Sequence, residues 1–353
     1  MHQARSKALS FAVSPRRAGG VLLRVLGGLL AVLAALAALG AACGSLPSEE
    51  VRERILALPK NAPFEAALVP SVRTSGGTEV LSAHFPASDE AEKTGRSIVL
   101  VHGTPDSMGA WEPLMFGPGA LAGQEDVWTL EILGHGMSPA GGGEVTFQRC
   151  ADFIGEALAA LDLEEVTLVG NSYGGEFCWR AALDHADRIA RLVVIDSSGL
   201  PRAEHEFLSE EVKMREWSVA RLGYLLNSES RVGFALDPHF DGAADPERVR
   251  EVFLTLENRG NWNAMIDLVR DENGLREGDL AGLSTPTLLL WGEHDAAYPP
   301  ERFGRRFEET IPDARLVVIE GAGHYPHEQD PARVAREILA FHRAEGEAIK
   351  KRR

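Results

Sequence analysis

The chain has 353 residues, 44% of them hydrophobic, and a formal net charge of −16 at pH 7. This length and apolar content allow a sizeable buried core, and no segment resembles a repeat or a nucleic-acid module. Residues 1–48 carry five basic residues and no acidic one, so the overall −16 leaves −21 for the remainder. Such an acidic body argues against nonspecific binding to nucleic acid or to anionic lipid surfaces.

The basic head is followed by 18 uncharged residues, Val25 to Ala42, rich in Leu, Ala and Gly. At about 1.5 Å per helical residue this segment would reach about 27 Å, at the edge of what spans a bilayer. It therefore predicts an export segment and not a core helix, and we expect residues 1–48 to be a signal or anchor segment.

Cys43 comes directly after three small residues at 40–42. This stretch resembles the lipobox of bacterial lipoproteins, in which the cysteine is lipidated and becomes the mature N-terminus, although Leu39 stands one place further back than usual. An uncleaved anchor and an ordinary cleaved signal stay open as alternatives. We expect a cell-envelope protein tethered to the membrane, with its folded body outside the cytoplasm.

The remaining elements follow in chain order. Residues 49–69 are interpreted as a polar connector with a short helix, and residues 72–85 as an opening hairpin around the turn signal at 75–77. Further strands are expected near 97–101, 126–132, 165–169, 191–196, 286–291 and 314–319. They alternate with amphipathic helical stretches, which predicts an α/β fold with a doubly wound, mostly parallel, eight-stranded sheet.

Strand signals vanish between residues 198 and 284, while apolar residues recur at helical spacing. We expect residues 199–284 to form a helical cap that separates two core parts, 70–198 and 285–353. The cap aromatics are Phe207, Trp217, Tyr224, Phe234, Phe240, Phe253 and Trp262. Most should pack inside the cap and a minority should line a pocket, because aromatic residues at helical spacing pack first.

An apolar strand ends directly before the run Gly-Asn-Ser-Tyr-Gly at 170–174, and a helix-compatible segment follows it. A serine on so sharp a turn is held out toward substrate, and larger side chains at the flanking glycines would collide. The bare pattern is weak, since a chain with 36 glycines generates chance matches. Ser172 therefore needs a base, a carboxylate and oxyanion donors elsewhere in the chain.

Two downstream turns supply these partners. Asp295 follows the strand near 286–291 and His324 follows the strand near 314–319. Each residue is placed just past the carboxyl end of a strand, where α/β sheets bind ligands. We expect Ser172 as nucleophile, His324 as base and Asp295 as its carboxylate, with Asp196 at another strand end as the alternative carboxylate.

The oxyanion donors should be backbone N–H groups. One is that of Tyr173, directly after the nucleophile, and the other is that of Thr104, in the His-Gly-Thr-Pro loop at 102–105. We expect His102 to order this loop by hydrogen bonds and to take no part in the chemistry.

These four turns together resemble the α/β-hydrolase superfamily over about residues 70 to 343. The loop at 131–138 is similar to the family's Asp-x-x-Gly-x-Gly-x-Ser loop, with Glu131 as a structural carboxylate in place of aspartate. His327 and Glu328 also fit the family, and we expect them to order the site.

A serine at the elbow implies acyl transfer to water. Epoxide hydrolases and haloalkane dehalogenases have a similar loop but use an aspartate nucleophile, which Ser172 replaces. The leading expectation is a serine hydrolase acting on a small-molecule acyl or carboxylic ester substrate, without metal or organic cofactor. Carbon–carbon bond hydrolases share the Gly-Asn-Ser-x-Gly-Gly elbow and stay open, as does a ligand-binding or signalling member of the fold.

The two cysteines of the folded part are Cys150 and Cys178. Export would place them in an oxidising compartment, which allows a disulfide between them. Two separately buried thiols are the preferred interpretation.

Overall fold

The computed structural model describes residues 27–28, 45–91, 94–202, 220, 223–240, 242–274 and 276–344. The expected export segment, apart from residues 27–28, and Cys43 lie outside these ranges. The chain divides into two compact units, Met1–Ser45 and Leu46–Arg353. Within the described ranges, no helix is long and apolar enough to cross a membrane.

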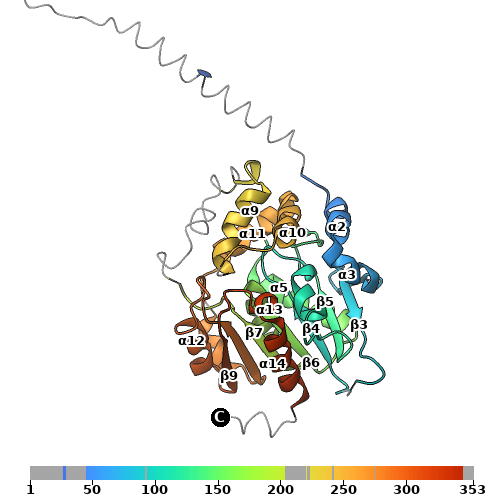
Figure 1. Ribbon diagram of the computed structural model, residues 1–353, viewed down its shortest axis with the longest axis vertical. Helices are drawn as coiled ribbons and strands as arrows, with labels where there is room; N and C mark the ends of the chain where they lie inside the picture. The colour runs from blue at the N-terminus through green and yellow to red at the C-terminus, as the bar shows by residue number, and fades with distance from the viewer. Residues whose placement is uncertain are drawn as a thin grey trace, which may run out of the picture. The chain divides into compact units, whose positions relative to one another are not determined.

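The centre of the body is a seven-stranded sheet with the order β3-β5-β4-β6-β7-β8-β9 among the described residues (Figure 1). Its strands are β3 (Ser82–Phe85), β4 (Ser97–Val101), β5 (Asp126–Leu130), β6 (Val166–Asn171), β7 (Ile189–Ile195), β8 (Thr287–Gly292) and β9 (Ala314–Ile319). β3 runs antiparallel to β5, and the other pairs are parallel. Strands β6 and β8 are rich in Val and Leu and buried throughout, as expected of parallel strands covered on both faces.

The predicted opening hairpin does not add two strands to this sheet. β1 (Val72–Arg73) and β2 (Glu79–Val80) pair with each other in a separate two-stranded sheet. Gly77, at a φ of +84°, helps close the tight turn between them, and the chain leaves the hairpin before β3 begins. The α/β fold class is therefore confirmed, but the predicted count of eight strands is wrong for the described main sheet, because the arms of this hairpin are only two residues long.

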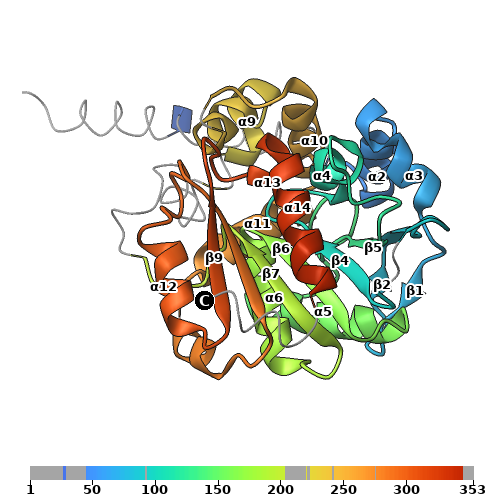
Figure 2. The same ribbon diagram turned by 60° about the horizontal axis from the view of Figure 1, so that its bottom comes forward.

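Helices cover both faces of the sheet. They are η2 (Met108–Trp111), α4 (Glu112–Phe116), α5 (Phe147–Ala160), α6 (Tyr173–Asp184), α12 (Phe303–Thr310), α13 (Pro326–Gln329) and α14 (Pro331–Arg343). Alternate residues of β4 face opposite sides: Val99 and Val101 pack in a core with α5, α6 and α12, whereas Ile98 and Leu100 pack in a core with α4 and α14. Figure 2 shows α14 lying across the strands on the second of these faces.

The predicted connector at 49–69 is part of the folded body. It forms α2 (Ser48–Leu56), η1 (Pro59–Asn61) and α3 (Ala62–Ala67). Val51, Ile55 and Phe64 are fully buried in the α4–α14 core. The interpretation of a polar linker before the fold is therefore wrong, because apolar residues four apart in α2 give this helix a face that must be covered.

The described part of the chain between β7 and β8 is helical and contains no strand. It holds α9 (Glu229–Leu236), η4 (Asp237–His239), α10 (Pro246–Leu256), α11 (Arg259–Asp271) and η5 (Glu277–Gly282), of which α9, α10 and α11 gather at one end of the body (Figure 1). These helices share a small core that contains Trp262, Tyr224, Phe240 and Phe253. Phe234 is 73% exposed, and Phe207 and Trp217 lie outside the described residues.

Cys150 in α5 and Cys178 in α6 are both buried and free. The expectation of two separate thiols is therefore confirmed. Burial raises the pKa of both thiols, so both carry their proton at neutral pH.

Candidate active site

Ser172 occupies the single residue between β6 and α6, with φ 56° and ψ −125°. A non-glycine residue in this region costs about 1–3 kcal/mol and persists only where its surroundings hold it. Here the Ser172 N–H donates to Ile195 O at 2.9 Å, and its carbonyl accepts from the Gly175 N–H at 3.0 Å. β7 and α6 thus fix the turn that presents the hydroxyl.

The glycines around Ser172 are required by backbone contacts. A Cβ on Gly170 would lie 2.3 Å from Gly174 O, and a Cβ on Gly174 would lie 2.3 Å from His102 O. The collision that the sequence predicts at the flanking glycines is therefore confirmed, because neither backbone oxygen can move without shifting a strand or its loop.

The structure brings Ser172, His324 and Asp295 into one hydrogen-bonded chain. The Ser172 Oγ lies 2.9 Å from His324 Nε2, and His324 Nδ1 lies 2.9 Å from Asp295 Oδ2. All three residues are buried, with 7%, 2% and 3% of their surface exposed, respectively. The tautomer that satisfies both bonds carries its proton on Nδ1 and leaves Nε2 to accept from the serine hydroxyl.

Asp295 is held as an ionised carboxylate. Its Oδ1 accepts the N–H groups of Ala297 at 2.8 Å and Tyr298 at 3.1 Å, while Oδ2 faces His324. Burial opposes the charge, but the neighbouring His324 and these hydrogen bonds outweigh it and lower the pKa of Asp295. The carboxylate can therefore orient the imidazole and stabilise its cation.

The backbone of His324 is held from two sides. Its N–H donates to the carbonyl of His239 in η4 at 2.7 Å, and its carbonyl accepts from the Asn171 side chain at 3.2 Å. Asn171 also donates to Ile195 O at 3.2 Å. Sequence reasoning assigned no role to Asn171, although its place directly before Ser172 in the elbow was a usable signal.

The His-Gly-Thr-Pro loop after β4 passes directly over the elbow, since a Cβ on Gly103 would lie 3.1 Å from Ser172 Cβ. The Thr104 hydroxyl lies 2.5 Å from His135 Nε2, which fixes the loop at the expected donor. Tyr173, the other expected donor, is the first residue of α6. Tyr173 is thus the residue directly after Ser172, and Thr104 follows the residue at which the loop approaches the Ser172 side chain.

Both ring nitrogens of His102 form hydrogen bonds with backbone groups. Its Nδ1 lies 2.8 Å from Gly103 O, and its Nε2 accepts from the Ile132 N–H at 3.2 Å. Burial lowers the pKa of this imidazole and keeps it neutral. These contacts agree with the expected role in ordering the loop.

Glu131 connects η2, which follows the loop at 102–105, to the loop at 131–138. Its two carboxyl oxygens accept the N–H groups of Met108 at 3.0 Å and Met137 at 2.8 Å. Burial nevertheless raises the pKa of Glu131 to about 8. The contacts are those of the structural carboxylate that the sequence predicts.

A buried ion pair that the sequence did not predict joins α10 to the core. Arg248 donates to Asp106 at 2.6 Å and to Glu328 at 3.0 Å, and its side chain is 1% exposed. His327, beside Glu328, packs its ring 4.5 Å from that of Trp111. Glu328 thus contacts α10 through Arg248, and His327 packs against Trp111 in the core.

Glu272, just after α11, was also missed. It accepts the hydroxyls of Tyr173 at 2.8 Å and Tyr298 at 3.0 Å, and it pairs with Arg202 at 3.1 Å. This single carboxyl group connects Tyr173, directly after Ser172, with Tyr298, whose N–H donates to Asp295.

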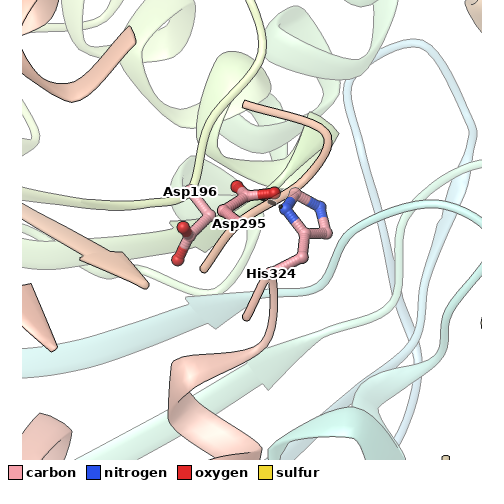
Figure 3. A group of neighbouring side chains, drawn as sticks. All are labelled: Asp196, Asp295 and His324. Carbon is pink, nitrogen blue, oxygen red and sulfur yellow. Dashed lines mark hydrogen bonds and ion pairs between the residues drawn. The ribbon is translucent and has the colours of Figure 1, made fainter. Parts of the chain in front are cut away.

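The alternative carboxylate, Asp196, lies beside this chain of hydrogen bonds. Its Oδ1 accepts the Gly292 N–H at 2.9 Å, and among the described residues Asp295 makes the bond to His324. One carboxyl oxygen of Asp196, one of Asp295 and one ring nitrogen of His324 lie within 4.8 Å of one another (Figure 3). They do not fit a metal site, because a hydrogen bond to Asp295 already occupies His324 Nδ1.

Comparisons with known proteins agree with this architecture. The family model described as alpha/beta hydrolase fold matches residues 96–331. An uncharacterized protein of Mycobacterium tuberculosis is 24% identical over 259 residues, 68% of this chain and 73% of that protein. A carboxylesterase of Bacillus subtilis is 24% identical over 254 residues, 70% and 81% of the two chains. A 2-hydroxy-6-oxo-6-(2'-aminophenyl)hexa-2,4-dienoic acid hydrolase of Metapseudomonas resinovorans is 25% identical over 284 residues, 78% and 92%.

Solved structures show the same fold at low identity. A bacterial membrane phospholipase A superposes with a TM-score of 0.65 and 20% identity, covering 96% of this chain and 100% of that one. A thermophilic esterase from Thermogutta terrifontis gives 0.62 and 24%, with 78% and 97% covered. Because the family model matches well over half of the 353 residues, this chain belongs to the alpha/beta hydrolase fold family.

Proposed function

We propose that this hydrolase cleaves carboxylic esters by a serine mechanism with an acyl-enzyme intermediate. One observation carries the proposal: two bonds of 2.9 Å connect Ser172 to His324 and His324 to Asp295. A hydroxyl is a weak nucleophile until a base removes its proton, and this arrangement supplies the base and the group that orients it.

In the first half of the reaction, His324 Nε2 takes the Ser172 proton as Oγ attacks the ester carbonyl. The N–H groups of Thr104 and Tyr173 receive the developing oxyanion, and Asp295 stabilises the imidazolium. The imidazolium then gives its proton to the leaving alkoxide, which leaves Ser172 acylated. In the second half, a water that loses its proton to His324 attacks the acyl carbonyl, and Ser172 recovers its proton as the acid departs.

The acyl side of the substrate should meet apolar and aromatic surface from the cap. Phe240 stacks on Tyr325 at 4.8 Å, next to His324, and His239 lies 5.2 Å from the His324 ring. Such a roof favours an acyl or aromatic group and excludes water during the reaction. A series of esters of rising chain length would measure the size of this space.

The test combines a fluorophosphonate label with p-nitrophenyl esters of rising chain length. We expect the label on Ser172, and turnover that Ser172→Ala lowers on the order of 10⁴-fold or more. Ser97→Ala is the matched control, because Ser97 bonds Asp126 at the first residue of β4 and should leave turnover unchanged. Absence of label from Ser172 in folded protein would contradict the proposal.

Carbon–carbon bond hydrolysis is the second candidate. The Gly-Asn-Ser-Tyr-Gly-Gly elbow at 170–175 and the similarity to the dienoic acid hydrolase favour it. Labelling of Ser172 without turnover of any ester would support this candidate, if a vinylogous 1,5-diketone is then cleaved. Labelling without turnover of either substrate would instead support a ligand-binding role.

We also propose a membrane tether outside the cytoplasm, supported by the uncharged segment Val25 to Ala42 and the small residues before Cys43. Metabolic labelling with a radioactive fatty acid should mark the chain, and Cys43→Ala should abolish the signal. An unchanged signal would contradict lipidation at this cysteine.

A further inference from the structure

Asp196 is a fully buried carboxyl group that the proposed mechanism does not use. It follows β7 directly and is held at a φ of +44°, where non-glycine residues are uncommon. Its backbone N–H donates to Leu290 O at 3.1 Å, and its Oδ1 accepts from the Gly292 N–H at 2.9 Å. β8 thus holds Asp196 on both its backbone and its side chain.

The neighbour of this carboxyl group is a second carboxyl group. One carboxyl oxygen of Asp196, one of Asp295 and one ring nitrogen of His324 all lie within 4.8 Å of one another. Figure 3 shows the two acids side by side. Among the residues that the structure describes, no Lys or Arg forms an ion pair with either acid, and His324 bonds Asp295. Two carboxylates in one buried site cannot both be charged without a large electrostatic penalty.

The hydrogen bonds decide which acid is charged. Asp295 accepts two backbone N–H groups and faces His324, so it is the carboxylate. Asp196 Oδ2 is buried and has no donor among the described residues. An ionised oxygen in that position would lack a partner, whereas a protonated one can donate to the acid beside it.

Three titratable groups lie at or next to this site, and the charge of one of them, Asp295, also favours a protonated Asp196. His324 comes from the loop after β9, Asp295 from the loop after β8, and His239 from η4 in the cap. Burial first, and then the charge of Asp295, raise the pKa of Asp196 well above its ordinary value.

We propose that Asp196 is a neutral carboxylic acid that donates its proton in a hydrogen bond to Asp295 and so positions this carboxylate against His324. The proton stays on Asp196 throughout the reaction, and no bond to it is made or broken. Asp196 is therefore a positioning residue, and its effect on turnover rests on the proposed ester hydrolysis.

The protonation state can be measured without any substrate. Infrared spectra of the full-length protein at neutral pH in D₂O should contain the C=O stretch of a protonated carboxylic acid, which Asp196→Asn removes. Aspartate labelled with ¹³C should shift this band, which separates it from buried glutamic acids such as Glu131. A difference spectrum without a labelled carboxylic acid band would overturn the proposal.

Turnover tests the positioning role. Asp196→Asn stays neutral and keeps an N–H donor, so it should hold kcat/KM for a p-nitrophenyl ester within about threefold of the wild-type value. Asp196→Leu has similar volume but no donor and should lower kcat/KM by about 10- to 100-fold, as expected for a lost hydrogen bond to a charged group.

Two outcomes would contradict this role. If Asp196→Asn falls as far as Asp295→Asn, Asp196 acts as an ionised carboxylate. If Asp196→Leu matches the wild type, the donated hydrogen bond has no effect on the site. A wild-type protein that neither labels nor turns over esters would contradict the proposed function instead, while the infrared band would still test the state of Asp196.

Discussion

Gly174 lies where the first turn of α6 passes the end of β4. A Cβ there would meet His102 O at 2.3 Å and Val101 O at 2.7 Å, both of them backbone atoms. We expect Gly174→Ala to destabilise the protein by about 1–3 kcal/mol or more and to displace Ser172 from His324. Thermal unfolding and the rate of fluorophosphonate labelling should both report the change.

The matched control is Gly142→Ala, because a Cβ at Gly142 meets nothing within 4 Å. This variant should unfold and label like the wild type. An unchanged melting temperature together with unchanged labelling of Gly174→Ala would contradict the close approach of α6 to the end of β4.

Local patterns identified the residues at the turns and favoured Asp295 as the acid that bonds the base, but they left Asp196 open as an alternative. Asp196 and Asp295 both follow apolar strands, so a sequence pattern treats them alike. In the structure, the loop after β8 turns Asp295 toward Nδ1 of His324, while Asp196 bonds the N–H of Gly292. The choice depends on the course of loops that are distant from each other in the chain.

Among the elements between β7 and β8, α10 is the helix that Arg248 fixes to the core. Its guanidinium is buried between Asp106 and Glu328. Removing one partner of a buried ion pair costs about 3–5 kcal/mol, because the remaining charges lose their compensation. Arg248→Met should therefore lower the free energy of unfolding by about this amount, measured by denaturant unfolding.

Arg250, two residues further along α10, provides the control. It pairs with Glu229 on the surface, and the two side chains are 42% and 48% exposed. Exposed pairs contribute about 0–1 kcal/mol, so Arg250→Met should unfold close to the wild type. Equal effects of the two variants would show that α10 does not depend on the buried pair.

The positions of most elements were predictable from the sequence, because strands and helices leave local patterns of apolar residues. The role of residues 49–69 was not. α2 buries Val51 and Ile55 in the core that also holds residues of α4 and α14, and it packs against α10 and α3. Lys60 reaches Glu251 in α10 at 2.8 Å. The periodicity of α2 is visible in the sequence, but its partners are distant along the chain, and so a short amphipathic helix resembled a linker.

For the whole molecule, buried histidines predict loss of stability in acid. Burial lowers the pKa of His135 and His327 to about 3 each, whereas an unfolded histidine titrates near 6.5. The unfolded chain therefore binds more protons between these values. The stabilisation is present above about pH 6.5 and is lost as the pH falls toward 3.

Urea unfolding between pH 7 and pH 4.5 should show this decline. His327→Phe keeps a ring against Trp111 but binds no proton, so it should flatten part of the slope. A slope that is identical in the variant and the wild type would contradict the assignment of His327 as a buried neutral group.

The sequence by itself determined the α/β fold class and the three turns that hold Ser172, Asp295 and His324, because strand patterns and turn residues are local properties of the chain. Only the tertiary structure excluded Asp196 as the partner of His324 and decided the seven-stranded count of the described main sheet and the packing of α2. It also decided the ion pair of Arg248, whose partners are 142 and 80 residues away. Such contacts are selected by distance and burial in the folded body, and no periodicity along the chain records them.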